Sequence, residues 1–514
     1  MDLKLPGPSQ VWEKWKKNCK PIWKIAFLAA IIIGFMIHMP VLVRDIPNHD
    51  GLDSMYFDQN MITSGRWFLG VACGFSSYFS LPWLIGVLGL VFLGITAALL
   101  VELLGIEKQG TAVFVSGLLV AFPALASTFA YVYTLDGYML ALLLAVLAPL
   151  LTMKYRRGFI AGGIVLAFSM GIYQIYLSFA MLLSIYSIVM LFLADGAWKE
   201  KAKGLLRYLY MGVIGVSLYY VILQILLKIQ GKELASYQGI SEMGASDTGF
   251  VDIVKKIYGD FITFTARSGI LFKNVFSILA VILLVLLVVY ILFNVVREKK
   301  LYKSVWFYVT LTLLFLGLPV ATNVILMISP EVNYHLLMRY QWVLYLILPI
   351  AFVEKFGKSD GCRWLLVGTA FVFLFNFAVM DNIGYSNLQK KYEKTYALCV
   401  RLADRIEQAD GYYQGMPVAM IGVVGNENYP ETDITGEVTG SMIGLNGDYL
   451  LYTSTNYQAF FKHYLGITIE PVSGEEMFEI YYSEEYQAMG SFPAKDSVKV
   501  VDGILYIKLE NSEE

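Results

Sequence analysis

The fold is decided by stretches such as PWLIGVLGLVFLGITAALLVELL, residues 82–104, in which Glu102 is the only charged residue. About 20 apolar residues in an α-helix cross a hydrocarbon core roughly 30 Å thick. Similar blocks recur along the chain and predict an all-α polytopic membrane protein. The eleven predicted spans are 24–43, 82–104, 111–131, 137–153, 159–174, 176–194, 206–228, 274–296, 304–327, 337–353 and 364–380.

The composition agrees with this class. The chain has 514 residues, of which 57% are hydrophobic and 16% charged, whereas a soluble protein carries about 25% charged residues. The net charge of −2 offers no basic surplus for nucleic acid. The four cysteines show no CxxC pair and no metal-like spacing. Cys73 and Cys399 fall on the same predicted side, but nothing in a chain of this kind calls for a disulfide framework.

The short loops predict the orientation. Lys and Arg gather in the loops 154–157, 198–207, 297–303 and 354–363, and are absent from 132–136 and 174–176. Cytoplasmic loops carry such an excess, so we expect a plasma membrane protein with a cytoplasmic N-terminus. The first apolar block is too long for a signal peptide and lacks a cleavage site, so it is predicted to be retained. An odd number of spans places everything after Met380 outside.

Two domains are predicted, a transmembrane domain at 1–380 and an extracytoplasmic α/β domain at 381–514. The outer segment 44–81 mixes aromatic and polar residues, which predicts interfacial helices, and the outer segment 229–273 is a candidate lid. Beyond Met380, 387–408 is helical and polar, 416–424 is a buried strand and 478–489 suits a helix. Residues 498–509 predict a hairpin that turns at Asp502–Gly503.

The outer loops carry the candidate chemistry, because no charged residue falls at the centre of a predicted span, as a proton pathway requires. Glycosyl transfer from a lipid phosphate needs a carboxylate to deprotonate the acceptor hydroxyl and positive charge for the leaving phosphate. The first outer loop supplies ionisable residues at Asp45, His49, Asp50, Asp53 and Asp58, and Arg44, Arg66 and Arg339 stand at outer span ends.

Plainer interpretations stay open for each residue. The acids are equally explained as solvated loop residues, with Asp53 or Asp58 as a helix cap, and Asp136 as the N-cap of the fourth span. The two arginines Arg66 and Arg339 also suit snorkelling to lipid headgroups. Tyrosine is enriched at membrane interfaces. Tyr173, next to Gln174, is therefore equally explained as an interfacial residue, and the polar group Asn333, Tyr334 and His335 as an interfacial anchor. No HxxxH spacing is present, and no metal site is predicted.

The stretch NHDGLDSMYFDQNMITSGRW, residues 48–67, resembles the first outer loop of the Gtr type II glucosyltransferase family. In that family an acidic pair follows the first span and a Gly-Arg follows later. Here Asp50 takes the second acidic position, and Gly65–Arg66 provides the Gly-Arg. His49 stands where the family often has the first acid, which leaves metal dependence in doubt.

Further segments resemble the family in the same order. AYVYTLDGYM (130–139) implicates Tyr133 and Asp136, and SMGIYQIY (169–176) implicates Tyr173 and Gln174. The segments 392–408 and 417–422 resemble the start of the family's outer C-terminal part. The resemblance therefore covers nearly the whole chain.

This resemblance implies a bacterial GT-C type enzyme without a cofactor. It implies transfer of a hexose, expected to be glucose, from polyprenyl phosphate to a cell-surface polysaccharide or teichoic-acid-like acceptor. A flippase and a donor synthase are expected partners by resemblance only. Inversion is expected, with Asp50 as the base that deprotonates the attacking acceptor hydroxyl, and Asp136 orienting the sugar or the base. Substrate binding is expected of His49, Asp53, Arg66, Tyr133, Tyr173, Gln174 and Arg339.

Two alternatives lack this chemistry. A lipid or polysaccharide exporter would carry polar groups along a central path and internal repeats, and neither is evident. A structural scaffold whose outer region binds cell-wall polymer would not require the acids and arginines to converge.

Overall fold

The structure, a computed structural model, describes residues 7–53, 61–74, 76, 81–235, 249–424 and 436–509. It is mostly helical, with a small sheet near the C-terminus. Within these residues, nine helices are long and apolar enough to cross a membrane, or ten if one bent helix pair counts as a span. The protein is therefore a multi-pass membrane protein, as predicted.

A bundle of apolar helices forms the larger part of the molecule. The short helix α1 (Pro8–Asn18) precedes it. Its members are α2 (Pro21–Leu42), α5 (Pro82–Leu104), α6 (Gln109–Ala121), α7 (Pro123–Phe129), α8 (Leu135–Lys154), α9 (Gly158–Ile172), α10 (Tyr176–Leu193), α11 (Trp198–Gln230), α13 (Val275–Glu298), α14 (Val305–Thr322), α16 (Leu344–Phe356) and α17 (Asp360–Glu407). Small residues permit close packing: a Cβ on Gly86 of α5 would collide with Leu42 of α2.

Each of the eleven predicted segments overlaps an apolar helix, but within the described residues only nine or ten of these helices have the length and composition of a span. The helix α9 has only 15 residues, which is short for a span. The segment predicted as one span at 111–131 is divided into α6 and α7, which meet at 50°. Phe122 adopts an extended conformation there, because the ring of Pro123 disfavours helical geometry in the residue before it.

The last predicted span is part of a much longer helix. The helix α17 continues for 48 residues from Asp360 to Glu407, so the apolar segment 364–380 and the polar helix expected at 387–408 form one element. The boundary predicted at 380 falls inside it. The apolar run ends there, and residues 381–387 are weak helix formers, but they contain no proline and the helix continues into the stronger helix formers from Leu388 onward.

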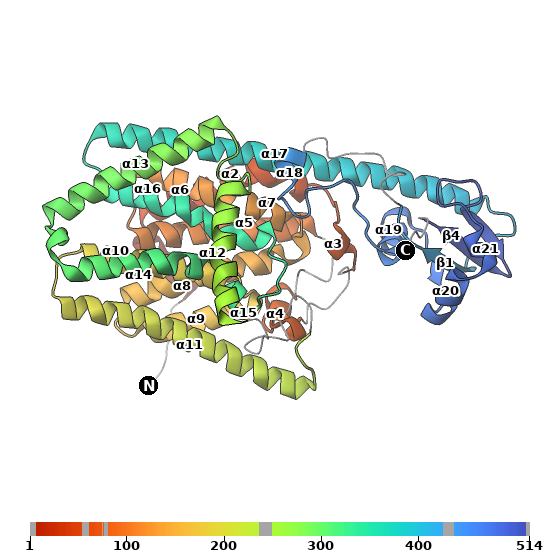
Figure 1. Ribbon diagram of the computed structural model, residues 1–514, viewed down its shortest axis with the longest axis horizontal. Coiled ribbons are helices and arrows are strands. Elements are labelled where there is room, and N and C mark those ends of the chain that lie inside the picture. The colour runs from red at the N-terminus through yellow and green to blue at the C-terminus, as the bar shows by residue number, and fades with distance from the viewer. Residues whose placement is uncertain are drawn as a thin grey trace.

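Further elements, most of them short, connect the spans. They are α3 (His49–Asp53), η1 (Ile62–Ser64), α4 (Leu69–Cys73), η2 (Val132–Thr134), α12 (Phe250–Arg267), η4 (Leu301–Lys303), α15 (Ile325–Ile328) and the 3₁₀ segment η5 (Leu336–Val343). In Figure 1 the helices of the bundle follow the long axis of the molecule and α12 runs across them. α12 lies within the segment predicted as a lid.

A small α/β region follows α17. Its elements are β1 (Pro417–Ile421), α18 (Gly436–Thr439), α19 (Ser454–Phe460), the π-helical turn η6 (Phe461–Leu465), β2 (Glu470–Pro471), α20 (Gly474–Tyr481), α21 (Glu484–Gln487), β3 (Val498–Val501) and β4 (Ile504–Lys508). The sheet order is β2-β1-β4-β3, with β1 parallel to both of its neighbours. The predicted buried strand is confirmed as β1, and the helix expected at 478–489 is divided between α20 and α21.

The predicted hairpin is confirmed. Strands β3 and β4 pair antiparallel with Val501 opposite Ile504. Asp502 and Gly503 both have positive φ, 49° and 82°, the geometry that makes Asp-Gly a favoured two-residue turn.

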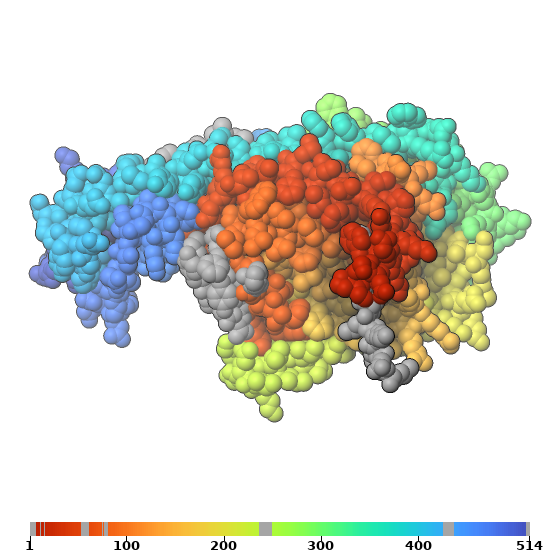
Figure 2. Space-filling model, turned by 180° about the vertical axis from the view of Figure 1, so that it is seen from behind, coloured from red at the N-terminus to blue at the C-terminus, as the bar shows by residue number. Residues whose placement is uncertain are grey.

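The α/β region stands beyond one end of the bundle, joined to it along α17 (Figures 1 and 2). We call this the domain end of the bundle. The connecting elements α3 and α4 lie at this end, and α3 lies between the bundle and the α/β region (Figure 1).

Candidate functional site

Arg66 is held over an aromatic pair at the domain end. Its guanidinium carbon lies 4.6 Å from the centre of the Tyr173 ring. Tyr173 is stacked on Tyr138, with ring centres 4.6 Å apart, and the Tyr138 hydroxyl accepts a hydrogen bond of 3.2 Å from Arg66 Nη1. A guanidinium over an aromatic face is favourable, so the ring of Tyr173 and the hydroxyl of Tyr138 together fix the direction of this charge.

The backbone turn before Arg66 explains why glycine precedes it. Gly65 has φ +74°, and a Cβ there would lie 2.5 Å from Gln174 Nε2 and 2.6 Å from the Tyr219 hydroxyl oxygen. Gln174 Nε2 donates to Ser64 O at 2.9 Å and to the Tyr219 hydroxyl at 3.0 Å, and that hydroxyl donates to Gly65 O at 3.0 Å. Gln174 is therefore buried as a support for the turn, while its neighbour Tyr173 carries Arg66.

His49 and Asp50 open the short helix α3. Asn48 anchors the start of α3 to the bundle, since its Nδ2 donates to Ala130 O at 2.6 Å and its Oδ1 accepts from Gly51 N at 2.7 Å. His49 Nε2 lies 3.2 Å from Asp50 Oδ1. The Asp50 side chain stays 48% exposed, so water or a substrate can reach its carboxylate.

Asp50 and Arg66 belong to one electrostatic neighbourhood. The Asp50 carboxylate interacts electrostatically with the Tyr138 hydroxyl, which is also the hydrogen-bond partner of Arg66. It interacts as well with His335, which precedes η5. Burial and the charge of Arg339 lower the pKa of His335, and the Asp50 carboxylate opposes this shift. Arg66 is thus in direct contact with Tyr138, and Asp50 acts on the same tyrosine through space, as the weaker influence.

Asp136 is occupied by structural bonds. It is buried in the first turn of α8, where Oδ2 accepts a hydrogen bond of 2.5 Å from Ser76 Oγ and Oδ1 accepts from Gly137 N at 2.9 Å. The thiol of Cys73 fills the space beside Gly137. This arrangement ties the end of α4 to α8, and the Asp136 carboxylate is turned toward that contact.

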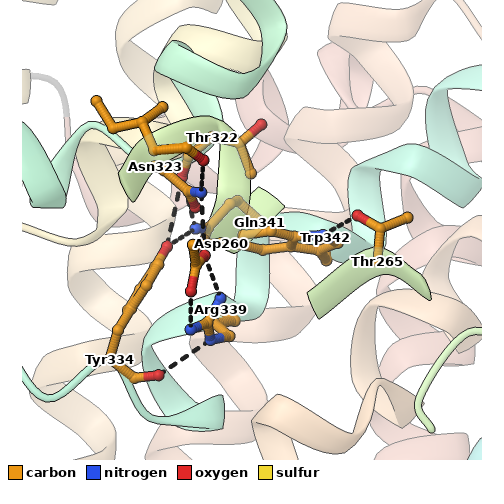
Figure 3. A network of polar contacts seen from close by, with 9 residues as sticks. Asp260, Thr265, Thr322, Asn323, Tyr334, Arg339, Gln341 and Trp342 are labelled. Carbon is orange, nitrogen blue, oxygen red and sulfur yellow. Dashed lines mark hydrogen bonds and ion pairs between the residues drawn. The ribbon is translucent and has the colours of Figure 1, made fainter. Parts of the chain in front are cut away.

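Arg339 is likewise engaged, as Figure 3 shows. Its Nη1 lies 2.7 Å from Asp260 Oδ2 and its Nη2 lies 2.7 Å from Asp260 Oδ1. Nε donates to Tyr334 O at 3.0 Å, and the guanidinium carbon lies 3.8 Å from the centre of the Tyr334 ring. Asn323 Nδ2 also donates to Asp260 Oδ2 at 3.0 Å. These bonds fasten α12 across the end of the bundle.

The remaining predicted residues are placed as follows. Tyr133 packs beside Gly51 of α3. The backbone of Asp53 ends α3, while its side chain and the whole of Asp58 lie outside the described residues. Cys73 and Cys399 are both buried free thiols. Among the described residues, no three His, Cys, Asp or Glu side chains gather as metal ligands would.

Sequence reasoning missed Tyr138, Tyr219 and Asp260. Tyr138 stands two residues after Asp136, inside the segment 130–139 that resembles the family, so the resemblance already pointed to this part of the chain. Tyr219 lies in the middle of an apolar span, and Asp260 lies in the predicted lid. Neither position carries a local signal, because their importance comes only from partners far away in the chain.

A separate apolar groove of about 420 Å³ opens between α10, α14 and α16. Its lining includes Leu182, Tyr186, Val189, Leu314, Leu318 and Leu348. Trp198 and Trp306 stack with ring centres 5.1 Å apart at the end remote from the α/β region. The other end reaches Tyr345, whose hydroxyl is 2.6 Å from Thr322 Oγ1. Because Gln341 Nε2 donates to the Thr322 carbonyl, the groove ends beside the Arg339 network.

Comparison with known proteins identifies one family. Residues 39–353 match the model of a family described as Glucosyl transferase GtrII, a segment that covers more than half of the chain. It includes every residue discussed above except those of α17 and the α/β region. None of the curated proteins and none of the solved structures matches the chain.

Proposed function

The chain belongs to the glucosyl transferase GtrII family, and is therefore a membrane glycosyltransferase; from this premise we propose that it moves a hexose, glucose in the first instance, from polyprenyl phosphate to a cell-surface glycan. The proposed site is the domain end of the bundle, which we place at the outer face of a bacterial plasma membrane. The C-terminal α/β region is then extracytoplasmic and the N-terminus cytoplasmic, in keeping with the Lys and Arg of the opposite loops.

The observation that carries the proposal is the relation of Asp50 to Arg66. A half-exposed carboxylate lies within electrostatic range of the Tyr138 hydroxyl, to which a fixed guanidinium donates a hydrogen bond. Transfer from a lipid phosphate needs one group to accept a proton and another to stabilise a phosphate, both within reach of a single sugar. Asp50 and Arg66 meet these two needs.

The proposed reaction is a single displacement. The acceptor hydroxyl oxygen attacks the anomeric carbon and its proton passes to the Asp50 carboxylate. The bond between the anomeric carbon and the phosphate oxygen breaks, and polyprenyl phosphate leaves with the electron pair. One displacement inverts the anomeric carbon. Arg66 stabilises the charge that grows on the phosphate, because charge-assisted hydrogen bonds to guanidinium are strong.

The structure changes the roles that we propose for three other residues. Arg339 is neutralised by Asp260, so we assign phosphate binding to Arg66 and a positioning role to Arg339. Asp136 and Gln174 become positioning residues too, since their polar atoms hold α4 and the Gly65 turn. His49, Tyr133 and Tyr173 remain beside Asp50 or Arg66 and stay in the proposed substrate site, and the substrate-binding role of Asp53 stays a prediction from the sequence.

The apolar groove is the proposed seat of the isoprenoid tail. Its lining on α14 runs from Trp306 to Leu318, about 18 Å of helix at about 1.5 Å per residue. It lies among membrane spans and ends beside the Arg339 network. A flexible hydrocarbon chain is the occupant that suits a long apolar groove joined at one end to a polar site.

The test is transfer of labelled glucose from synthetic polyprenyl-phosphate glucose by purified protein in detergent. The acceptor is cell-surface polysaccharide from a strain that lacks this chain, because its acceptor positions are still free. We expect Asp50→Asn to lower transfer by at least about 1,000-fold, since the only base is removed. Asp45→Asn, an exposed acid of the same connection, is the matched control and should stay near the wild-type rate.

Three outcomes contradict parts of the proposal. Equal transfer by wild type and Asp50→Asn rejects Asp50 as the base. Equal losses in the Asp50 and Asp45 variants show that the effect is not specific to the site. No transfer by folded wild-type protein, to the polysaccharide or to water, rejects this donor.

A further inference from the structure

The α/β region contributes an aromatic side chain beside the proposed base. In Figure 1 the helix α3 lies between the bundle and α19. The ring of Tyr452, two residues before α19 begins, meets the His49 ring edge-on, with centres 4.5 Å apart and planes at 79°. The Asp50 carboxylate also interacts electrostatically with the Tyr452 hydroxyl. Residues about 400 positions apart therefore share this part of the site.

Tyr452 is held in place from several directions. Its backbone N–H donates to Asn456 Oδ1 at 3.0 Å, and Asn456 Nδ2 donates to His49 O at 3.4 Å. Thr453 caps α19 by accepting from Asn456 N at 3.1 Å. Tyr449 meets the Tyr452 ring edge-on at 6.1 Å. The ring is thus fixed before any ligand arrives.

Despite these contacts, Tyr452 remains 46% exposed. The perpendicular contacts with His49 and Tyr449 leave this part of the tyrosine surface open to solvent. Rigid aromatic side chains with an apolar face and a polar tip supply contact area at low entropic cost. Such a face suits the C–H surface of a pyranose ring.

The acceptor has to approach Asp50 from a side that the donor leaves open. The donor phosphate is assigned to Arg66, whose guanidinium lies on the ring of Tyr173 in the bundle. The groove for the lipid tail also lies in the bundle. The α/β region contacts α3 through Tyr452 and Asn456, so the acceptor is expected between α3 and the segment 449–456.

We propose that Tyr452 is an acceptor-binding residue, on whose ring a neutral sugar unit of the acceptor glycan stacks with one hydroxyl directed at Asp50. The inference rests on the proposed function. A neutral unit is favoured because the Asp50 carboxylate beside the ring repels an anionic one. Tyr452 lies outside the matched segment 39–353, so acceptor choice is assigned to a part of the chain that the family model does not cover.

The experiment compares Michaelis constants for the two substrates. The donor is polyprenyl-phosphate glucose, and the acceptor is polysaccharide from a strain that lacks this chain. The variants are Tyr452→Ala and Tyr452→Phe. Tyr482→Ala is the matched control, because Tyr482 is another exposed aromatic residue of the α/β region, 65% exposed at the end of α20.

We expect Tyr452→Ala to raise the acceptor KM about 5- to 10-fold, the factor that corresponds to one lost aromatic contact. The donor KM should change less than about twofold. Tyr452→Phe keeps the ring, so its acceptor KM should stay near the wild-type value. Tyr482→Ala should also resemble wild type. A purely structural role would move both constants together and would not separate donor from acceptor.

Several results overturn the inference. An unchanged acceptor KM in Tyr452→Ala removes the stacking role, and equal rises for donor and acceptor show a structural defect. The same rise in Tyr482→Ala assigns the effect to exposed aromatic residues in general. These outcomes all require a working wild-type enzyme. Absence of transfer by the wild type instead contradicts the proposed function, so the two failures are distinguishable.

Discussion

The guanidinium of Arg339 and the carboxylate of Asp260 face one another in a two-bond ion pair, with both N–O distances at 2.7 Å. The pair joins η5 of the bundle to α12, and its side chains are only 9% and 23% exposed. A charge that is already paired and stacked on Tyr334 stabilises the fold. The ion pair distinguishes Arg339 from Arg66, although the sequence places both arginines at outer span ends.

Loss of the Asp260–Arg339 pair should therefore affect stability more than chemistry. Breaking a buried ion pair leaves one charge without a partner, and we expect Arg339→Gln to lower the midpoint of thermal unfolding in detergent by roughly 3–6 °C. Asp260→Asn should do the same, and the double variant should lose less than the sum. Additive losses would show that the two residues are not coupled.

The same variant separates the two arginines kinetically. We expect Arg66→Gln to raise the donor KM or lower kcat by roughly 100-fold without lowering thermal stability as far as Arg339→Gln does. A larger kinetic defect in Arg339→Gln than in Arg66→Gln would reverse our assignment of the phosphate-binding residue.

Gly65→Ala should misplace Arg66. The new methyl group would meet Gln174 Nε2 and the Tyr219 hydroxyl at 2.5 and 2.6 Å in a left-handed conformation, so the turn has to move. A displacement of about 1 Å near reacting groups lowers turnover by roughly 10- to 100-fold. Gly269→Ala is the control, since Gly269 has φ +69° but no neighbouring atom within 4 Å. Equal losses in both variants would leave backbone strain as the only cause.

Filling the apolar groove should change the preference for donor chain length. Leu314 lines the groove, whereas its neighbour Leu313 is 65% exposed and does not. We expect Leu314→Trp to lower kcat/KM for a long-chain polyprenyl-phosphate glucose about tenfold, and to leave a two-isoprene donor nearly unaffected. Leu313→Trp should resemble wild type with both donors. An unchanged ratio in Leu314→Trp would exclude this groove as the tail site.

Acidification should destabilise the protein partly through His335. Burial and Arg339 lower the pKa of His335 in the folded protein, whereas the unfolded chain titrates near about 6.5. The unfolded state therefore binds more protons between these two values, and stability falls as pH drops below about 6.5. We expect His335→Gln to show a smaller fall in thermal midpoint between pH 7.5 and 5. The same fall in both proteins would mean that other groups dominate.

Much of this molecule follows from the sequence alone. The apolar blocks predict the helices, since a chain in lipid has to satisfy its backbone hydrogen bonds within each helix. The Asp502–Gly503 hairpin follows from local turn chemistry. The family follows from short segments around Asp50, Arg66 and Tyr173 in a fixed order. In each case the deciding signal lies within a few neighbouring residues.

Tertiary structure decided what those residues do. Gln174, expected to line a sugar pocket, supports the turn at Gly65, and Asp136 holds Ser76. Arg339 is engaged by Asp260, and Tyr452 reaches α3 from the far end of the chain. A polar side chain looks the same in sequence whether its partner is a substrate or another residue. Only the packing of distant segments determines which partner it meets, because hydrogen bonds and ion pairs act over a few ångströms in space, whatever the separation along the chain.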